Sequence, residues 1–422
     1  MQNHTNLLSK EKTQKQNRVW VRIASACNNK CIFCLDSDAQ NGTFPKEEII
    51  KKQIKDGFKT GYENRIIISG GEASINPRFD EYIKYAKEIG YNRIQTVTNG
   101  NMFANEVFCK KVIDAGLQEI TFSFHGHNSK LHDYLVATPG AFKKSLKGLI
   151  YIKKSFPKVI LNIDIVVNKV NVKFLPEIVK FFMKLGVYEF DILQIIPFGR
   201  GFSENKDKLF YDIGENLSYL QETWKLSKID GVYMWTNRFP SEAFEGGFED
   251  LIQDPRKIKS EVMGEGYEMF EKFIISKGEK KPECFGEACK YCFIHDYCHD
   301  FLKLINKKKI ENKNDYKIIS GEEFPSHIYK KYGNTKEDFL NYLKDEKQKL
   351  INIPKCLGGT GIFQTYNDLD PKYTLEDYTK KYIKNLYRKK SLNCKKCKYY
   401  KECEGIHINF IRSYGFNILQ PI

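Results

Sequence analysis

One short loop constrains this chain more than any other feature. Three cysteines, Cys27, Cys31 and Cys34, follow an apolar, strand-like run from Val19 to Ala26 with the spacing C-x3-C-x2-C. A [4Fe–4S] cluster normally takes four cysteine ligands, so three thiolates leave one iron open to a substrate or cofactor. The alternative is a zinc loop, but structural zinc sites usually close with paired C-x2-C units. No such pair or histidine lies nearby, and we expect an iron–sulfur cluster with one open position.

Composition places the chain among folded proteins without a membrane span. Its 422 residues contain 41% hydrophobic and 14% aromatic residues, enough for one large or two modest domains. No apolar run reaches the length of a membrane span, and residues 1–17, which we expect to be flexible, lack an apolar signal core. We expect a cytoplasmic location. Because cytosolic thiols are kept reduced, the 12 cysteines indicate metal ligation or redox chemistry rather than disulfides.

The net charge of +15 raises the question of a nucleic-acid partner. The excess is mainly lysine, scattered in short runs such as Lys143-Lys144 and Lys389-Lys390. Such runs usually form solvated faces. Acidic peptide, RNA and no partner all remain open, but nucleic acid is not the partner that we expect.

From residue 18 to about 236, short β-branched runs alternate with stretches that have apolar residues at helical spacing. This alternation predicts an α/β fold, a parallel sheet with right-handed crossovers in a partial, six-stranded (β/α)6 barrel of the TIM type. Ligand loops then emerge at the carboxyl ends of the strands. The expected strands are Val19 to Ala24, Arg65 to Ser69, Arg93 to Thr98, Glu119 to Phe124, Val159 to Val167 and Glu189 to Ile195. The expected helices are Lys46 to Lys59, Pro77 to Ile89, Ala104 to Ala115, Ala141 to Ser155 and Phe174 to Leu185.

Two further motifs follow expected strands. Ser69-Gly70-Gly71-Glu72 follows the second strand, and its glycines allow a close backbone approach. Thr98-Asn99-Gly100 follows the third. The cysteine spacing, with an aromatic residue before the last cysteine, and the Gly-Gly-Glu turn resemble the radical S-adenosylmethionine (radical SAM) superfamily over roughly residues 18 to 200. There, SAM chelates the open iron of the cluster.

The resemblance implies a set of SAM-binding positions. In the family the Gly-Gly-Glu backbone and acid hold the ammonium group, a Ser and an Asn bind the carboxylate and ribose, and the backbone after the sixth strand meets the adenine. The positions of this sequence that match are Phe33, Gly70, Gly71, Glu72, Asn99, Ser123, Asn168 and Ile196. No residue is assigned a catalytic role.

Several titratable residues follow the fourth strand at the same end of the expected barrel, namely His125, His127, His132 and Asp133. Histidine titrates near neutral pH, so these residues could bind substrate or move protons. Helix capping and surface roles are equally available to them.

The cysteines return after Trp235 in two copies of one triplet. The first copy is Cys289, Cys292 and Cys298, with Cys284 before it; the second is Cys394, Cys397 and Cys403, with Cys356 upstream. Eight thiolates match two auxiliary [4Fe–4S] clusters, with zinc as the alternative, since four-cysteine zinc sites also use C-x2-C pairs. The remaining cysteine, Cys109, lies in an apolar helical pattern and is expected in the core.

This cysteine-rich part, residues 237–422, resembles the SPASM and twitch extensions of radical SAM enzymes, in which C-x2-C-x5-C-x3-C is common. Here the position after Cys403 that should hold the fourth cysteine is His407, so either His407 ligates or Cys356 or another cysteine completes the set. Residues Phe301 to Lys349, rich in lysine and glutamate, read as a connector or cover.

The resemblance implies an enzyme that reductively cleaves SAM and abstracts hydrogen from a substrate, which we expect to be a peptide or protein side chain, with a small-molecule cofactor precursor second. It also implies an electron donor such as flavodoxin or ferredoxin. Two other classes compete. An iron–sulfur electron-transfer or scaffold protein would not need Gly70-Gly71-Glu72. A zinc-containing RNA-binding protein should show basic and aromatic patches on a nucleic-acid fold, and the sequence has none.

Overall fold

The strand–helix alternation of the first half of the chain builds a single parallel sheet. The computed structural model describes residue 8 and residues 17–264, 266–306, 315–364 and 373–422. The chain divides into two units, one of Thr13–Arg238 and one of Met1–Lys12 with Phe239–Ile422. Most of the expected flexible N-terminus, residues 1–17, lies outside the described residues.

The sheet has the strand order β1-β2-β3-β4-β5-β6-β7, and all neighbours are parallel. The strands are β1 (Asn17–Ala24), β2 (Asn64–Gly70), β3 (Arg93–Thr98), β4 (Glu119–Ser123), β5 (Ile160–Val167), β6 (Glu189–Gln194) and β7 (Tyr233–Asn237). The expected α/β parallel class is confirmed. The expected number of six strands is wrong, because the short run of β7 adds a seventh at the edge.

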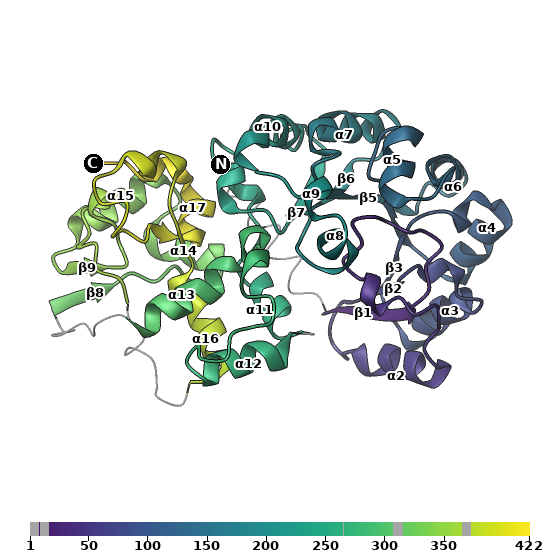
Figure 1. Cartoon of the computed structure of the whole chain (residues 1–422), viewed down its shortest axis with the longest axis horizontal. Coiled ribbons are helices and arrows are strands. Elements are labelled where there is room, and N and C mark those ends of the chain that lie inside the picture. The colour runs from purple at the N-terminus through teal and green to yellow at the C-terminus, as the bar shows by residue number, and fades with distance from the viewer. Residues whose placement is uncertain (1–7, 9–16, 265, 307–314, 365–372) are drawn as a thin grey trace. The chain divides into compact units, whose positions relative to one another are not determined.

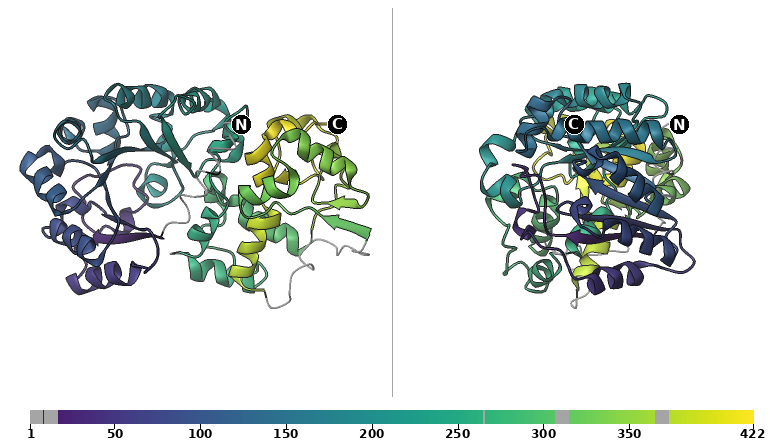
Figure 2. Two further views of the ribbon diagram at one scale, coloured as in Figure 1. Left: turned by 180° about the vertical axis from the view of Figure 1, so that it is seen from behind. Right: turned by 90° about the vertical axis from the view of Figure 1, so that its right-hand side faces the viewer.

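Helices surround the outer face of this sheet, as Figures 1 and 2 show. Asparagine side chains start two of them: Asn105 accepts hydrogen bonds from Val107 N and Phe108 N, and Asn128 accepts one from Leu131 N. The helices of this unit are α2 (Glu47–Gly57), α3 (Phe79–Ile89), α4 (Glu106–Ala115), α5 (Ser129–Val136), α6 (Ala141–Ser155), α7 (Leu175–Lys184), α8 (Gly199–Ser203), α9 (Lys206–Leu209) and α10 (Leu217–Leu226).

Alternate residues of the strands face the helices and form the apolar core. Val21 and Ile23 of β1, Ile66 and Ile68 of β2, and Ile163 of β5 are fully buried. The intervening residues lie on the opposite, inner face of the sheet. The core therefore fixes which side chains remain available on the inner face.

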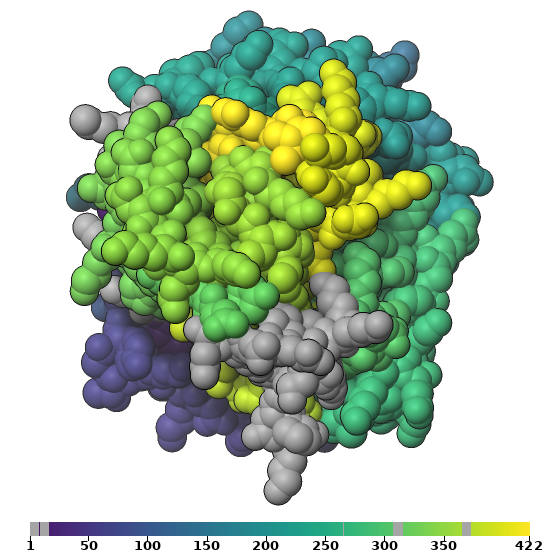
Figure 3. Space-filling view, turned by 90° about the vertical axis from the view of Figure 1, so that its left-hand side faces the viewer, coloured from purple at the N-terminus to yellow at the C-terminus, as the bar shows by residue number. Residues whose placement is uncertain are grey.

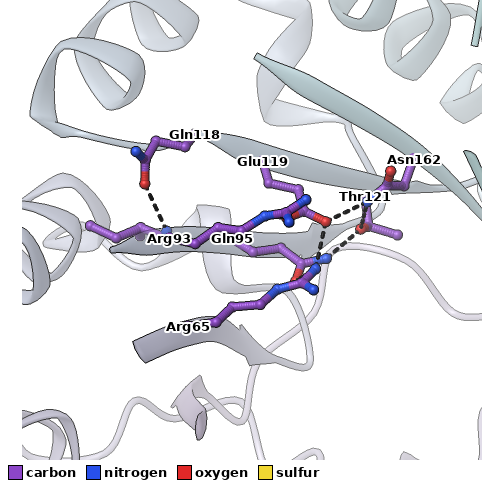
Figure 4. A network of polar contacts seen from close by, with 8 residues as sticks. Arg65, Arg93, Gln95, Gln118, Glu119, Thr121 and Asn162 are labelled. Carbon is purple, nitrogen blue, oxygen red and sulfur yellow. Dashed lines mark hydrogen bonds and ion pairs between the residues drawn. The ribbon is translucent and has the colours of Figure 1, made fainter. Parts of the chain in front are cut away.

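A polar network, drawn in Figure 4, crosses the inner face near the amino ends of the strands. Glu119, only 1% exposed, accepts hydrogen bonds from Arg65 Nη2 at 2.6 Å, from Asn162 Nδ2 at 2.6 Å and from Arg93 Nε. Arg65 also donates to Gln95, whose amide donates to Thr121 at 2.8 Å. Both oxygens of the buried Glu119 carboxylate thus accept hydrogen bonds from the chain. We call this network the floor; its residues are Arg65, Arg93, Gln95, Glu119, Thr121 and Asn162.

The second unit is mainly helical. Its helices are α11 (Lys257–Val262), α12 (Tyr267–Ile275), α13 (His295–Ile305), α14 (Pro325–Tyr332), α15 (Lys336–Asp345), α16 (Leu375–Lys381) and α17 (Ile408–Tyr414). Two small sheets pair β8 (Tyr316–Ile318) with β9 (Lys349–Ile351) and β10 (Arg388–Lys389) with β11 (Ile406–His407). None of the helices in the described part of the chain is long and apolar enough to cross a bilayer.

The stretch Phe301 to Lys349 is more than a connector. Its helices α14 and α15 pack against α17 through Tyr332, Phe339 and Phe410, and Tyr414 Oη donates to Gly333 O at 2.6 Å. In Figure 3 the light-green surface of this stretch lies against the yellow surface of the last residues. The described part of this stretch is therefore built into the core of the second unit.

Candidate functional site

The loop that carries Cys27, Cys31 and Cys34 is held by segments that follow other strands. Lys30 N and Ile32 N donate to Val136 O and Leu135 O at the end of α5. On another side, Arg200 of α8 and Asn205 donate to Cys31 O and Ile32 O. In Figure 1 this loop, in purple, passes around α8 beside the carboxyl ends of the strands. The fold thus fixes the loop at the edge where the sequence predicts ligand binding.

The three thiols of this loop lie close together. Burial raises the pKa of Cys31, and the neighbouring thiols of Cys27 and Cys34 raise it further. Burial also raises the pKa of Cys27 to about 11. Two N–H groups point at the sulfurs: Asn29 N lies 3.4 Å from Cys27 Sγ, and Gln40 Nε2 lies 3.3 Å from Cys34 Sγ. Three half-buried, grouped thiols, two of which receive N–H bonds, fit the donor set of an iron–sulfur cluster.

The two glycines after β2 lie against the start of this loop. Gly71 N donates to Ala24 O and Glu72 N donates to Ala26 O, both at 2.8 Å. A Cβ atom at Gly71 would come within 2.4 Å of Ala26 O, and one at Gly70 within 2.3 Å of Ala24 O. The close approach that these glycines allow is therefore made first to the chain's own backbone, just before Cys27.

Glu72 is buried and accepts several hydrogen bonds from the protein. Its Oε1 accepts from Ser74 N, Ser74 Oγ and Thr98 Oγ1, while its Oε2 accepts from Asn99 N at 2.6 Å. Burial raises the pKa of this carboxyl, and these hydrogen bonds oppose the rise. The side chain thus ties the turn after β2 to the turn after β3, and Oε2 keeps the greater capacity for a further donor.

The turn after β3 is joined to the cysteine loop by amide side chains. Asn99 Nδ2 donates to Asn28 Oδ1 at 2.6 Å, and Asn101 Nδ2 donates to Asn29 Oδ1 at 2.8 Å. Asn29 Nδ2 and Asn101 Oδ1 are buried and have no hydrogen-bond partner within the described part of the chain. Buried polar atoms are normally satisfied, so these atoms suit a polar ligand beside the cysteines. Only Asn99 of these four was singled out from the sequence.

The other predicted SAM-binding residues lie around the same edge. Phe33 and Ile196 are buried, and the Phe33 ring packs edge-on against His125 at 4.5 Å. Ser123 Oγ donates to Asp164 Oδ2 at 3.3 Å on the inner face. Asn168 is fully buried, and its amide bonds to Val166 O and Val170 N within the turn after β5. Its role toward a ligand stays a prediction.

The polar residues after β4 serve mainly as structural groups. His132 Nδ1 accepts from His125 N, and His125 Nδ1 accepts from Val166 N. Burial holds the pKa of His125 far below its usual range and lowers that of His132 to about 4, so both rings are neutral at physiological pH. Asp133 accepts from Gly140 N and Phe142 N, and His127 pairs with Asn128. These contacts favour the structural alternative for His125 and Asp133, whereas His127 Nδ1 and His132 Nε2 are buried and have no hydrogen-bond partner among the described residues.

The second unit brings the first later cysteine set together. Burial raises the pKa of Cys292 to about 12, and the Cys284 and Cys289 thiols add to the rise. Burial also raises the pKa of Cys298, on α13, and the thiols of all three other cysteines raise it further. Gly286 N lies 3.3 Å from Cys289 Sγ. The four cysteines of this set therefore form one group.

The second later set is also grouped. Burial raises the pKa of Cys394, and Cys356, Cys403 and Cys397 raise it further. Backbone N–H groups of Ile422 and Tyr399 lower the pKa of Cys397. Cys356 lies 38 residues before Cys394 in the sequence. The effect of its thiol on the pKa of Cys394 nevertheless places it in this group of four.

His407, the other candidate for that place, is engaged elsewhere. Its Nε2 lies 2.9 Å from Ile383 O, and its Nδ1 accepts from Asn409 N. Burial lowers its pKa to about 3. Both ring nitrogens are therefore used by the fold. Cys109 is also apart from the three groups, buried on α4 with its thiol 3.0 Å from Phe103 O.

The cysteine groups are wider than the coordination sphere of one ion. Among the described residues, no set of three or more Cys, His, Asp or Glu side chains lies close enough to hold a single metal ion. Thiolates around a cubane bind different irons and need not converge on one point. All twelve thiols are free of disulfides.

Sequence comparisons relate the first half of this chain to radical SAM proteins. The sequence model of the radical SAM superfamily matches residues 21–182. The AdoMet-dependent heme synthase of Methanosarcina barkeri is 28% identical over 211 residues, 49% of this chain and 58% of that protein. A probable GTP 3′,8-cyclase of Sulfurisphaera tokodaii is 24% identical over 182 residues, 43% of this chain and 56% of that protein. The chain thus spans little more than half the length of these curated relatives.

Among solved structures, Streptococcus suis SuiB bound to precursor peptide SuiA aligns with a TM-score of 0.42 and 16% identity, covering 69% of this chain and 60% of SuiB. The matched region of the family includes the cysteine loop, the Gly-Gly-Glu turn and Ser123. The chain therefore carries a radical SAM domain over residues 21–182.

Proposed function

We propose that this protein binds a [4Fe–4S] cluster through Cys27, Cys31 and Cys34, and SAM at the open iron, and uses the pair to abstract hydrogen from a substrate. The observation that supports this most is the grouping of the three half-buried thiols on a loop held against the Gly70-Gly71-Glu72 turn. An electron-transfer or scaffold protein would have no need for that turn beside the cysteines.

The chain's own residues would orient SAM and exclude water. Glu72 Oε2 and the turn carbonyls would accept the ammonium group, while Asn29 and Asn101 offer unpaired amide atoms next to the cysteines. Phe33 and Ile196 provide buried apolar surface for the adenine. The chemistry supplied there by a bound, reduced cluster is one-electron cleavage of the SAM sulfonium to methionine and a 5′-deoxyadenosyl radical, which takes a hydrogen atom from a substrate C–H bond.

The two later cysteine groups would hold two auxiliary [4Fe–4S] clusters. Each group has four thiols, the usual ligand count of such a cluster. They would pass electrons or, if one iron is open, bind substrate. An external one-electron donor such as flavodoxin or ferredoxin would reduce the enzyme. The free thiols support a cytoplasmic location, where such thiols stay reduced.

Two substrate classes have separate support. The spacing of the later cysteines, typical of peptide-modifying radical SAM enzymes, favours a peptide or protein side chain. The curated relatives, a heme synthase and a probable GTP cyclase, favour a small-molecule cofactor precursor. The reaction proposed at the cysteine loop is the same in both cases.

Anaerobic reconstitution with iron and sulfide, followed by assay of 5′-deoxyadenosine from SAM, tests the proposal. Cys27→Ala, Cys31→Ala and Cys34→Ala should each abolish SAM cleavage, because three ligands are the minimum that holds the cluster with one iron free. Cys109→Ala is the matched control, since that thiol lies outside all three groups and its loss should leave cleavage intact. A loop variant that formed 5′-deoxyadenosine at the parental rate would refute the proposal.

A further inference from the structure

One row of side chains crosses the inner face of the sheet. Ser123, Asp164, Asp191 and Trp235 are register partners on the adjacent strands β4, β5, β6 and β7. Register partners on parallel strands project to the same face. The preceding inward row, Thr121, Asn162, Glu189 and Tyr233, includes two residues of the floor, Thr121 and Asn162. The Asp164 row therefore lies beyond the floor, toward the strand ends that carry the cysteine loop.

Asp164 is the unusual member of this row. Its Oδ2 accepts from Ser123 Oγ, but its Oδ1 is shielded from solvent and has no hydrogen-bond partner among the residues that the structure describes. Burial raises the pKa of Asp164 to about 8, Asp191 raises it too, and Arg238 opposes the rise. A buried oxygen without a donor is costly and therefore points to a partner that the protein itself does not supply.

The neighbours of Asp164 have the character of a cation-binding surface. Asp191 is oriented by Asn237, whose Nδ2 donates to Asp191 Oδ1 at 2.5 Å. Next in the row, Trp235 is 39% exposed, and its ring stacks with that of Tyr233 of the preceding row at a centroid distance of 6.4 Å. Carboxylates attract cations, and the exposed face of a tryptophan ring attracts them as well.

The floor provides the contrast. There the carboxylate of Glu119 accepts hydrogen bonds from Arg65, Arg93 and Asn162, so both of its oxygens have donors from the chain. In the Asp164 row, by contrast, no donor of the described residues reaches Asp164 Oδ1. Building on the proposed function, we propose that this row binds a cationic nitrogen group of the substrate, a primary ammonium or a guanidinium, with Asp164 Oδ1 accepting its hydrogen bond.

Such a group belongs to a lysine or arginine side chain of a peptide or to a small-molecule amine. Both sources share the chemistry that the row recognises. Bound there, the cation would hold one end of the substrate on the inner face of the sheet. The other end of the substrate would then extend toward the carboxyl ends of the strands, where SAM is proposed to bind.

The test uses the whole 422-residue chain, anaerobically reconstituted, with SAM and ligand-observed saturation-transfer NMR at pH 8.5. This pH lies above the pKa of about 8 of Asp164, so its carboxyl is ionised while the amine and guanidine probes remain cationic. The probes are n-butylamine and n-butylguanidine, with n-butanol as the neutral isostere and Gly-Gly-Lys-Gly-Gly as the peptide arm. The parent should bind the cations at least about tenfold more tightly than butanol, and Asp164→Asn should lose that margin, as expected for one charge-assisted hydrogen bond. Asp114→Asn, on the outer helix α4, is the matched control.

Trp235→Leu gives a second readout that does not depend on the fate of the Asp164 variant. It should weaken cation binding about threefold and leave butanol binding unchanged, since only the cation uses the ring face. Tighter binding of the peptide than of butylamine assigns the group to a peptide, and the reverse order assigns it to a small molecule.

Equal binding of butanol and the cations, or unchanged cation binding in Asp164→Asn, would overturn the inference. So would weaker SAM binding in Asp164→Asn, because the free oxygen would then belong to the SAM site. SAM cleavage by the parent separates the two proposals. Cleavage without cation preference rejects only the inference, whereas cation binding without cleavage rejects the proposed reaction.

Discussion

At the residue scale, the carboxylate of Glu72 has two predicted roles: it holds two turns together, and it binds the SAM ammonium. Its Oε1 accepts hydrogen bonds from the turns after β2 and β3, and its Oε2, which accepts from Asn99 N, is the atom that we propose for the SAM ammonium. Glu72→Ala should weaken SAM binding by about one to two decades, the value of a charge-assisted contact of about 1.5–3 kcal/mol. It should also lower the apparent melting temperature, because Thr98 Oγ1 and Asn99 N lose a buried acceptor.

Calorimetric titration with SAM and iron analysis of the same samples check this prediction. The first cluster should keep about four irons, since Glu72 makes no contact with a cysteine among the hydrogen bonds of the described residues. Unchanged SAM affinity with a lowered melting temperature would make Glu72 a purely structural residue of the two turns.

Asp164 predicts a pH dependence of stability. Its pKa of about 8 in the folded protein lies above the ordinary value of 3.8, so folding favours the protonated form. The stabilisation is complete below pH 4 and is lost as the pH rises toward 8. Asp164→Asn, which cannot ionise, should therefore gain stability relative to the parent as the pH rises from 5.5 to 8.5. Melting temperatures of both proteins across this range, with Asp114→Asn as control, measure the difference.

At the scale of elements, the turn after β2 depends on a residue without a Cβ atom. A methyl group at Gly71 would meet Ala26 O at 2.4 Å and Cys27 Cβ at 3.2 Å. Gly71→Ala should therefore displace the start of the cysteine loop and cost about 1–3 kcal/mol, the usual range for overpacking. Gly214→Ala, where the new Cβ meets only Asp212 Oδ1 at 3.0 Å, is the control.

Melting temperature, iron content and SAM affinity would report the displacement. The parent and Gly214→Ala should agree in all three, while Gly71→Ala should be lower in melting temperature and SAM affinity. Parental SAM affinity in Gly71→Ala would mean that the loop tolerates the shift and that the turn does not position Cys27.

Most elements of the first unit were predictable because their cores repeat simple patterns. The six expected strands appear within two residues of their predicted bounds, since β-branched runs such as that of β2 alternate with amphipathic helices. Strand β7 was missed because it is short and only two of its residues, Met234 and Thr236, are buried.

The grouping of ligands was partly visible in the sequence and partly not. Spacing placed Cys27, Cys31 and Cys34 on one loop, and the same rule suggested each later triplet. The amides of Asn29 and Asn101, and the free oxygen of Asp164, come together only through strand register and turn geometry. No local pattern carries that information, and the same holds for the arginines that meet at Glu119.

At the scale of the whole molecule, the three thiol groups predict a metal inventory. Reconstituted parent protein should hold about twelve irons, four per cluster. Replacing Cys289, Cys292 and Cys298 together should remove about four, and replacing Cys394, Cys397 and Cys403 should do the same. SAM cleavage should survive in both, because the first loop is intact, while conversion of the true substrate fails.

Elemental analysis of anaerobically purified protein distinguishes zinc in the later groups. A content of about four irons together with stoichiometric zinc would support the proposed radical SAM cluster and reject the proposed auxiliary clusters. In that case the triple variants should mainly unfold the second unit, since structural zinc contributes directly to folding.

The three thiol groups also differ in how much of the chain must be synthesised before each can close. The first spans Cys27 to Cys34 and the second Cys284 to Cys298, so each is drawn from a short stretch. The third runs from Cys356 to Cys403, and its Cys397 receives an N–H bond from Ile422. On a translating ribosome the third group would thus be the last to mature, because synthesis must pass Cys403 before its four thiols are all available.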